Sequence, residues 1–260
     1  MRKHIYYLIG AVLLAFSFSS CSKKDNCDPE DQNSPCYSGI GAGSKLLLTG
    51  HTLNGEVIAQ FEYDNQHRRT RYILKTGTIE YSYNAKGLLS STIYKDGGGK
   101  VTHREDYTYG SGEAPVSMVI SNPGNKDDVP VDVQYTYSAN KIIETSVPRR
   151  AGSGVTTNTF LFNEQGNLTD IITAMAGVTS TSSWAEFDNK PSAAIHGDPY
   201  HWKNSKNNAQ RFRVASAVYN LDQKWAYTYN AEGYPIKALI YNNGADDVAE
   251  EHVFSYKKAK

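Results

Sequence analysis

A short aromatic motif recurs along most of the chain and limits it to a repetitive β fold. Eight segments have the form aromatic–x–aromatic–turn residue, except that Ala185 replaces the first aromatic of the sixth segment. Self-similarity at a fixed period is the sequence signature of a repeat architecture. The second aromatics are Tyr63, Tyr83, Tyr109, Tyr137, Phe162, Phe187, Tyr229 and Tyr256.

The residues after the motif predict β-hairpins. Because side chains alternate along a strand, the two rings of each motif lie on one face. Residues 84–87, 163–166 and 230–233 begin with Asn and end with Gly. Asn bonds its side chain to the turn backbone, and Gly adopts the positive φ that closes a three-residue hairpin loop. No segment after Cys21 has a helical period, so we expect an antiparallel meander.

The pattern resembles the YD repeats of RHS-type proteins, and in particular the short, lipid-anchored YD-repeat-like proteins of Gram-negative bacteria. Residues 81–87, 160–166 and 227–233 carry the resemblance, which covers residues 57–256. The sequence departs from it at His67, where glycine is expected, in residues 137–142, which lack the glycine, and at Pro191 in the sixth unit. RHS repeats wind into a shell around a toxin, but eight short units are too few to enclose one.

The resemblance and the pattern together predict an all-β domain over residues 40–260, built as an open, twisted antiparallel β-meander of about eight hairpin repeats. We expect roughly 14–16 strands, and a sheet of that size tends to curl or split. A β-sandwich or a barrel is the alternative. The 19 tyrosines are interpreted as the core, because a tyrosine ring covers apolar surface while its hydroxyl stays hydrated.

The N-terminal segment is typical of an exported protein. Arg2, Lys3 and His4 precede an apolar run over residues 5–18, which is shorter than the roughly 20 residues that span a bilayer. This predicts a signal peptide over residues 1–20.

The end of that segment, Phe18-Ser19-Ser20-Cys21, resembles the lipobox of bacterial lipoproteins, although Phe18 replaces the usual Leu. The resemblance implies lipid attachment at Cys21 and location at the outer membrane, on the cell surface or the periplasmic face. Residues 21–39 are polar and predict a flexible tether. Cys27 and Cys36 lie in it, as a possible disulfide or as free thiols.

The interval between Phe187 and Tyr229 is 42 residues, against about 25 elsewhere, which places an insertion at about residues 190–215. Loops on a rigid scaffold often carry function, so Tyr200, His201 and Trp202 are candidates for a ligand-binding stacking platform. Alternatively, the loop folds over one sheet face and Trp202 plugs an open edge. His196, Asp198 and His201 are interrupted by Gly and Pro, and we expect no metal.

The sequence favours a non-enzymatic protein without a cofactor. It contains no Gly-x-Ser-x-Gly elbow, and its paired carboxylates lie in polar turns. Equal numbers of basic and acidic residues, 27 of each, argue against nucleic acid as a partner. We therefore expect a lipid-anchored envelope protein that is a binding or scaffold module for a glycan or an envelope protein. The alternatives are a polysaccharide hydrolase and a periplasmic carrier that uses the sheet face.

Overall fold

The computed structural model describes residues 45–259 except residues 126, 194 and 243. The expected signal peptide and tether, with Cys21, Cys27 and Cys36, lie outside the described residues. In the described part, no helix is long and apolar enough to cross a membrane.

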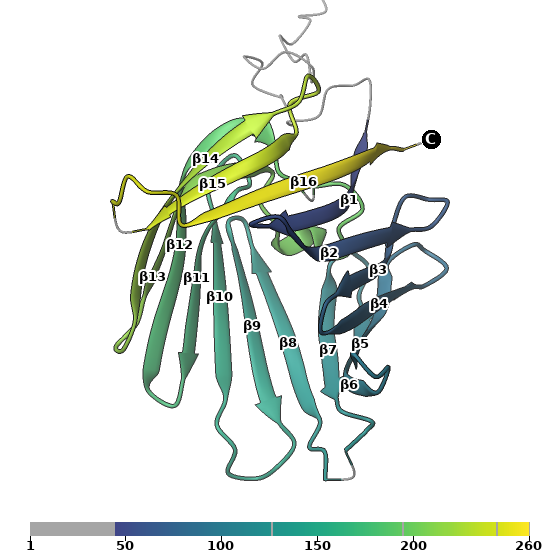
Figure 1. Ribbon diagram of the computed structural model, residues 1–260. Helices are drawn as coiled ribbons and strands as arrows, with labels where there is room; N and C mark the ends of the chain where they lie inside the picture. Colours follow the sequence, from purple (N-terminus) through teal and green to yellow (C-terminus); the bar gives the residue numbers. More distant parts are fainter. Residues whose placement is uncertain (1–44, 126, 194, 243, 260) are drawn as a thin grey trace, which may run out of the picture.

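The domain is all-β, as predicted, and its strands form a closed barrel (Figure 1). Every strand pairs antiparallel with the next one, and β1 pairs with β16 through Leu48 and Tyr256. The strands are β1 Leu46–Leu53, β2 Glu56–Tyr63, β3 Arg69–Leu74, β4 Gly77–Tyr83, β5 Leu89–Asp96, β6 Val101–Tyr109, β7 Pro115–Ser121, β8 Val131–Ser138, β9 Lys141–Pro148, β10 Thr156–Phe162, β11 Leu168–Met175, β12 Val178–Pro191, β13 Asn207–Ala215, β14 Asn220–Tyr229, β15 Pro235–Asn242 and β16 Glu250–Lys258.

The prediction of an open meander was therefore wrong, and the barrel alternative is confirmed. The repeats do form a meander of consecutive hairpins, but the meander curls until its first and last strands meet. Closure pairs the backbone groups that two free edge strands would have left unpaired. The first strand, β1, precedes the first aromatic motif, so the repeat pattern carried no sign of it.

The turns have the predicted chemistry. The side-chain Oδ1 of Asn84 accepts hydrogen bonds from the backbone N–H groups of Lys86 and Leu88 at 2.9 and 3.1 Å, and Gly87 has φ 79°. In the first unit Asp64 takes the place of Asn, and His67 adopts the positive φ, 64°, without being glycine. Histidine tolerates this conformation better than most residues.

The strand alternation separates two faces. The first aromatics point into the barrel, where Phe61, Tyr81, Tyr135 and Phe160 are buried, whereas Glu62 between two rings is exposed. Two clusters form the core. One groups Met118, Val133, Tyr135, Ile142, Phe160 and Leu168, and the other groups Leu48, Ala59 and Phe61.

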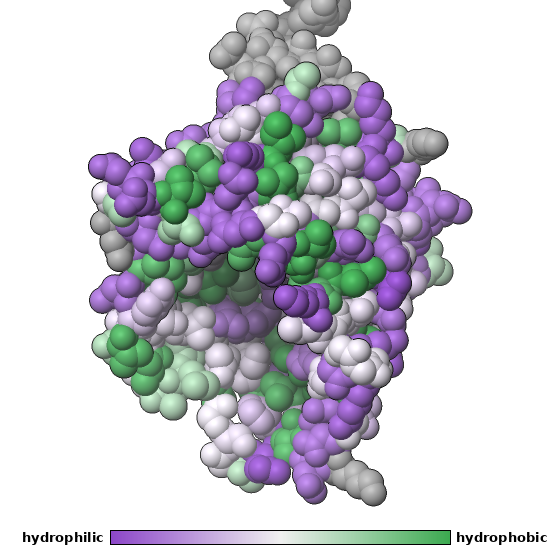
Figure 2. Space-filling model, viewed as in Figure 1, coloured by the Kyte–Doolittle hydropathy of each residue, from purple (hydrophilic) through white to green (hydrophobic). Residues whose placement is uncertain are grey.

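The outer face is polar and charged. Opposite charges of neighbouring strands, or of the residue just after a strand, pair across it in Glu62–Arg71 (3.0 Å), Glu80–Lys95 (2.7 Å), Asp132–Arg149 (2.7 Å), Arg211–Asp222 (2.7 Å) and Lys237–Glu251 (2.9 Å). Arg104 and Asp106 pair within β6 at 2.7 Å. Figure 2 shows hydrophilic residues over most of the viewed face, around a central hollow with hydrophobic residues inside it. The barrel thus presents polar groups outward and rings inward.

The second aromatics join successive strands. The hydroxyl of Tyr83 on β4 donates to the carbonyl of Arg69 on β3 (2.6 Å), and Tyr109 on β6 donates to Leu89 on β5 (2.8 Å). Tyr63, Tyr137 and Tyr256 do the same to Leu48, Pro115 and Pro235, all at 2.7 Å. Each bond ties a strand to the one before it, which gives the repeated tyrosine a structural role in the sheet.

Candidate functional site

A single loop crosses the barrel interior. Residues 192–206, described except for residue 194 and here called the plug, connect β12 to β13 and contain the 3-10 helix η1, His201–Lys203 (Figure 1). The N–H of Ser192 donates to the carbonyl of Lys206 at 2.8 Å and closes the base of the loop. The expected insertion at about 190–215 is therefore part plug and part strand β13.

On one side the plug is fixed to strand β3. The carboxylate of Asp198 pairs with Nη1 of Arg69 at 3.3 Å, and their side chains are only 11% and 6% exposed. The N–H of Arg69 donates to the carbonyl of Gly197 at 3.0 Å. Gly197 has φ 69°, and a Cβ there would lie 2.5 Å from the carbonyl oxygen of His67. Only glycine lets the plug approach the β2–β3 turn this closely.

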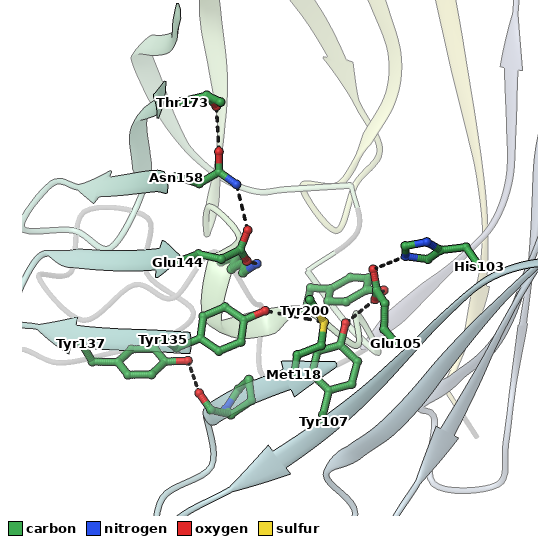
Figure 3. A network of polar contacts seen from close by, with 12 residues as sticks. His103, Glu105, Tyr107, Met118, Tyr135, Tyr137, Glu144, Asn158, Thr173 and Tyr200 are labelled. Atoms are coloured by element: carbon green, nitrogen blue, oxygen red, sulfur yellow. Dashed lines mark hydrogen bonds and ion pairs between the residues drawn. The ribbon is translucent and has the colours of Figure 1, made fainter. Parts of the chain in front are cut away.

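A few strands along the same wall, Tyr200 enters a polar cluster centred on Glu105 of β6 (Figure 3). The hydroxyl of Tyr200 donates to Glu105 at 3.3 Å and lies 3.1 Å from the hydroxyl of Thr92. Tyr107 also donates to Glu105, and His103 lies 3.2 Å from it. Burial would raise the pKa of Glu105, but the hydrogen bonds from His103 and Tyr107 outweigh it and lower that pKa.

A second buried carboxylate binds the end of the plug. Lys203 forms an ion pair with Glu144 of β9, and its ammonium lies over the rings of Tyr135 and Phe160, 5.0 and 4.9 Å from their centroids. Glu144 also accepts from Asn158 at 2.9 Å, and Asn158 accepts from Thr173 at 2.8 Å. Figure 3 shows this chain of polar side chains running across β9, β10 and β11.

Glu105 and Glu144 are thus both engaged in holding the plug. A general acid in a glycosidase needs a raised pKa and a free proton to give, whereas Glu105 has a lowered pKa and Glu144 is paired with a cation. Burial raises the pKa of Tyr200, so its hydroxyl stays protonated and serves as a donor. The arrangement is that of a structural anchor.

The three predicted ligand-binding residues lie on the plug but point in different directions. Tyr200 is directed to Glu105, Trp202 packs against the Met118 cluster, and His201 is exposed. The rings of Tyr200 and Trp202 meet edge to face, with 75° between their planes. They therefore form no flat stacking surface, and the alternative interpretation of Trp202 as a plug residue matches its placement, although inside a barrel instead of at an open edge.

Two half-buried histidines have polar partners. His196 lies 2.8 Å from the hydroxyl of Tyr234, and burial followed by the charge of Lys45 lowers its pKa to about 4. His51 bonds to His252 at 2.8 Å, and burial followed by that neighbour lowers the pKa of His51 to about 4. The described residues contain no group of three or more His, Cys, Asp or Glu side chains placed to hold a metal ion.

A cavity of about 200 Å³ lies beside the plug, against the wall formed by β12, β13 and β14. Its aromatic side is made of Trp184, Phe212, Trp225 and Tyr227, and Ser192 and Ser205 of the plug complete it together with Asn207, Asn208 and Ala209. These four rings were not predicted from the sequence as site residues. The signal was present, because tryptophans at 184 and 225 interrupt otherwise Tyr- and Phe-based strands on both sides of the insertion.

Neither protein-family models nor curated protein sequences match this chain. Among solved structures, the fold is similar to that of a porin-like protein from Bacteroides vulgatus ATCC 8482, with a TM-score of 0.56 and 12% sequence identity. The alignment covers 82% of this chain and 99% of that protein. At this identity the likeness concerns the fold alone.

Proposed function

We propose that this chain is a non-enzymatic binding protein of the cell envelope, held at the outer membrane by a lipid on Cys21, that takes a glycan into the interior of its barrel. The observation that carries the proposal is the distribution of polarity. Ion pairs lie between strands on the outer face, and aromatic rings with a cavity line the inner face.

The outer face supports a barrel that stands in water. A barrel that spans a membrane turns an apolar band about 25 Å tall toward the lipid. Here the outward positions of adjacent strands hold the pairs Glu80–Lys95 and Lys237–Glu251 instead. Charged groups facing lipid near the bilayer centre cost about 2–4 kcal/mol each. In our proposal the outer face of this barrel therefore lies in water, and the barrel holds a ligand inside it and does not form a pore through a membrane.

Contacts in the interior support binding over catalysis. Glu105 accepts from Tyr107 and Tyr200, and Glu144 holds Lys203, so these carboxylates are occupied by the protein itself. The aromatic cavity beside the plug offers surface for a ligand, and no Asp, Glu or His side chain is among the residues that line it. Pockets of this kind, with rings and a few polar groups, are typical of small-ligand sites.

The anchor and the hydrated barrel can be tested together. A specific protease site is inserted at residue 39 of the full chain, and washed membranes are then cleaved. We expect the uncut protein in the membrane pellet and the cut barrel in the supernatant without detergent. Metabolic labelling with a palmitate analogue should mark the wild type and not Cys21→Ala. A barrel that stays in the pellet after complete cleavage contradicts the proposal.

Ligand binding is tested with the full-length protein in a mild detergent on an array of envelope and plant glycans. Retention of glycans is the expected result. A protein that retains none, and from which organic solvent extracts stoichiometric lipid, would support the carrier alternative instead.

A further inference from the structure

The cavity between the plug and strands β12–β14 has the chemistry of a site for one neutral sugar ring. We propose that it binds the terminal pyranose of a glycan, with its C–H face on the aromatic wall and its hydroxyls toward the plug. This inference rests on the proposed function and gives it a location and a ligand class.

The aromatic wall is made of two ring pairs that come from three strands. Trp184 of β12 meets Phe212 of β13 with ring centroids 5.2 Å apart, and Trp225 and Tyr227 of β14 lie 6.2 Å apart. Ring faces carry partial negative charge, and the C–H groups of a pyranose carry partial positive charge. A sugar ring can therefore stack on this wall while its hydroxyls stay directed away from it.

The opposite side of the cavity is polar. The hydroxyl oxygen of Ser205 accepts from the N–H of Leu168 at 2.9 Å, which leaves its proton available to donate. Ser192 and Asn208 also line the cavity. The side-chain amide of Asn208 already donates to Asp188 and to the Pro191 carbonyl, whereas an aliphatic ligand would leave the hydroxyl proton of Ser205 without an acceptor, at a cost comparable to a lost hydrogen bond. A polyhydroxylated ligand would supply that acceptor.

One buried donor at the cavity has no protein partner. The indole Nε1 of Trp225 is buried without a hydrogen-bond partner in the described structure, and it belongs to a residue that lines the cavity. Indole N–H is only a donor, and a buried donor without an acceptor requires an explanation. Because this nitrogen is buried, it does not face the open volume of the cavity, and what Trp225 offers a ligand there is its aromatic ring. Trp202 shares this property, but its ring packs in the Met118 cluster.

The lining excludes a charged ligand and a long one. The cavity is bounded by Trp, Phe, Tyr, Ser, Asn and Ala side chains, so no Asp, Glu, Lys, Arg or His contributes a charge to it. Its volume of about 200 Å³ is below the roughly 300–1,000 Å³ of pockets for drug-sized ligands. The fit is to a single uncharged ring, which means that the end of a glycan chain would be recognised and the remainder would extend into the lumen.

The test uses the full chain with ¹⁵N-labelled tryptophan, in which only three indole N–H signals are present because the sequence has three tryptophans. The probes are methyl glucoside, methyl galactoside and methyl N-acetylglucosaminide, with the anionic sugar sialic acid for comparison. We expect at least one neutral pyranoside to shift the Trp225 signal, identified by its loss in Trp225→Phe, and sialic acid to leave it unchanged.

Variants then locate the site. Trp225→Phe replaces the indole with a smaller ring and Trp184→Leu removes a ring from the wall, so both variants should bind more weakly than the wild type, Trp184→Leu by about tenfold. Tyr219→Phe, which alters an exposed tyrosine on the turn between β13 and β14, is the control and should bind as the wild type does. Near-ultraviolet circular dichroism of each variant checks that the barrel is folded.

The outcomes separate this inference from the proposed function. A glycan that binds without moving the Trp225 signal, and equally well to Trp225→Phe, overturns the site and leaves glycan binding in place. If sialic acid binds more tightly than the neutral pyranosides, the proposal that the ligand is a neutral sugar is wrong. Failure of the wild type to bind any glycan of the array or any of these pyranosides contradicts both.

Discussion

The carboxylate of Asp198 lies 3.3 Å from Nη1 of Arg69, and this buried ion pair joins the plug to a strand that precedes it by 129 residues. Nε and Nη2 of the same guanidinium are buried without partners. The ion pair with Asp198 therefore offsets most of the free-energy cost of burying the charge of Arg69, and breaking it should destabilise the folded protein.

We expect Asp198→Asn to lower the free energy of unfolding by about 3 kcal/mol, because removing one partner leaves the other charge buried and uncompensated. Urea unfolding followed by tryptophan fluorescence measures it. The matched control is Glu56→Gln, which breaks the exposed pair Glu56–Lys75, whose side chains are 74% and 79% exposed. That change should cost less than about 0.5 kcal/mol. If both variants lowered the free energy of unfolding by the same amount, water would be solvating the Arg69 guanidinium in the folded protein.

Gly197→Ala should displace the plug. A methyl group would meet the His67 carbonyl at 2.5 Å and the Tyr63 ring at 2.7 Å, and φ is 69°. Gly152→Ala is the control, since Gly152 has φ 79° with nothing within 4 Å of an added Cβ. We expect about 1 kcal/mol of backbone strain in the control and at least 2 kcal/mol more in Gly197→Ala, measured by thermal unfolding. A similar melting temperature for both would show that the plug moves freely.

Tyr137→Phe tests the tyrosine bonds between strands. The variant removes the donor to the Pro115 carbonyl and should cost about 1 kcal/mol in chemical denaturation. Tyr219→Phe, at an exposed ring, should change stability by less than half of that. The fifth unit carries Phe162 at the same position, so one missing bond is tolerated and the variant should still fold.

Stability should fall as the pH drops from 7.5 to 5. His51 and His196 have folded-state pKa values of about 4, below the usual 6.5 of the unfolded chain. Between these values the unfolded state binds more protons, so the stabilisation is complete above pH 6.5 and is lost progressively toward pH 4. Because both rings are only half-buried, we expect about 1 kcal/mol per histidine at pH 5.

The measurement is urea unfolding at several pH values for the wild type and His196→Gln. The variant lacks one titrating ring, so its curve should have a smaller slope over this range. A wild type whose stability is unchanged from pH 7.5 to 5 would contradict the low pKa values.

Local chemistry made the hairpins predictable from the sequence. Asn84 and Gly87 specify their turn through a side-chain acceptor and a positive φ, both of which depend on neighbouring residues only. The inward rings followed from a period of two. The likeness of these repeats to the YD family stays a prediction, as does lipid attachment at Cys21.

Closure and the plug depended on contacts that no local pattern encodes. Leu48 and Tyr256 pair over more than 200 residues of chain, and their meeting results from twist accumulated over all the strands between them. The insertion was recognised by its length, but whether it lay on the sheet or within a barrel depended on that closure. Trp184 and Trp225 share a wall because β12, β13 and β14 pair in order, but the plug that completes their cavity could be placed only with the barrel closed.

The first described strand starts at the end of the barrel that the plug occupies. Leu46 of β1 pairs with Lys258 of β16. The carbonyl of Leu48 accepts a hydrogen bond from the hydroxyl of Tyr63, and the ring of Tyr63 lies against Gly197 of the plug. A lipid at Cys21 would therefore connect, through the predicted tether, to the end of the barrel that the plug occupies. The opposite end, with hairpin loops such as residues 149–155, would carry no attachment to the bilayer and would stay accessible to the glycan chain that follows a bound sugar ring.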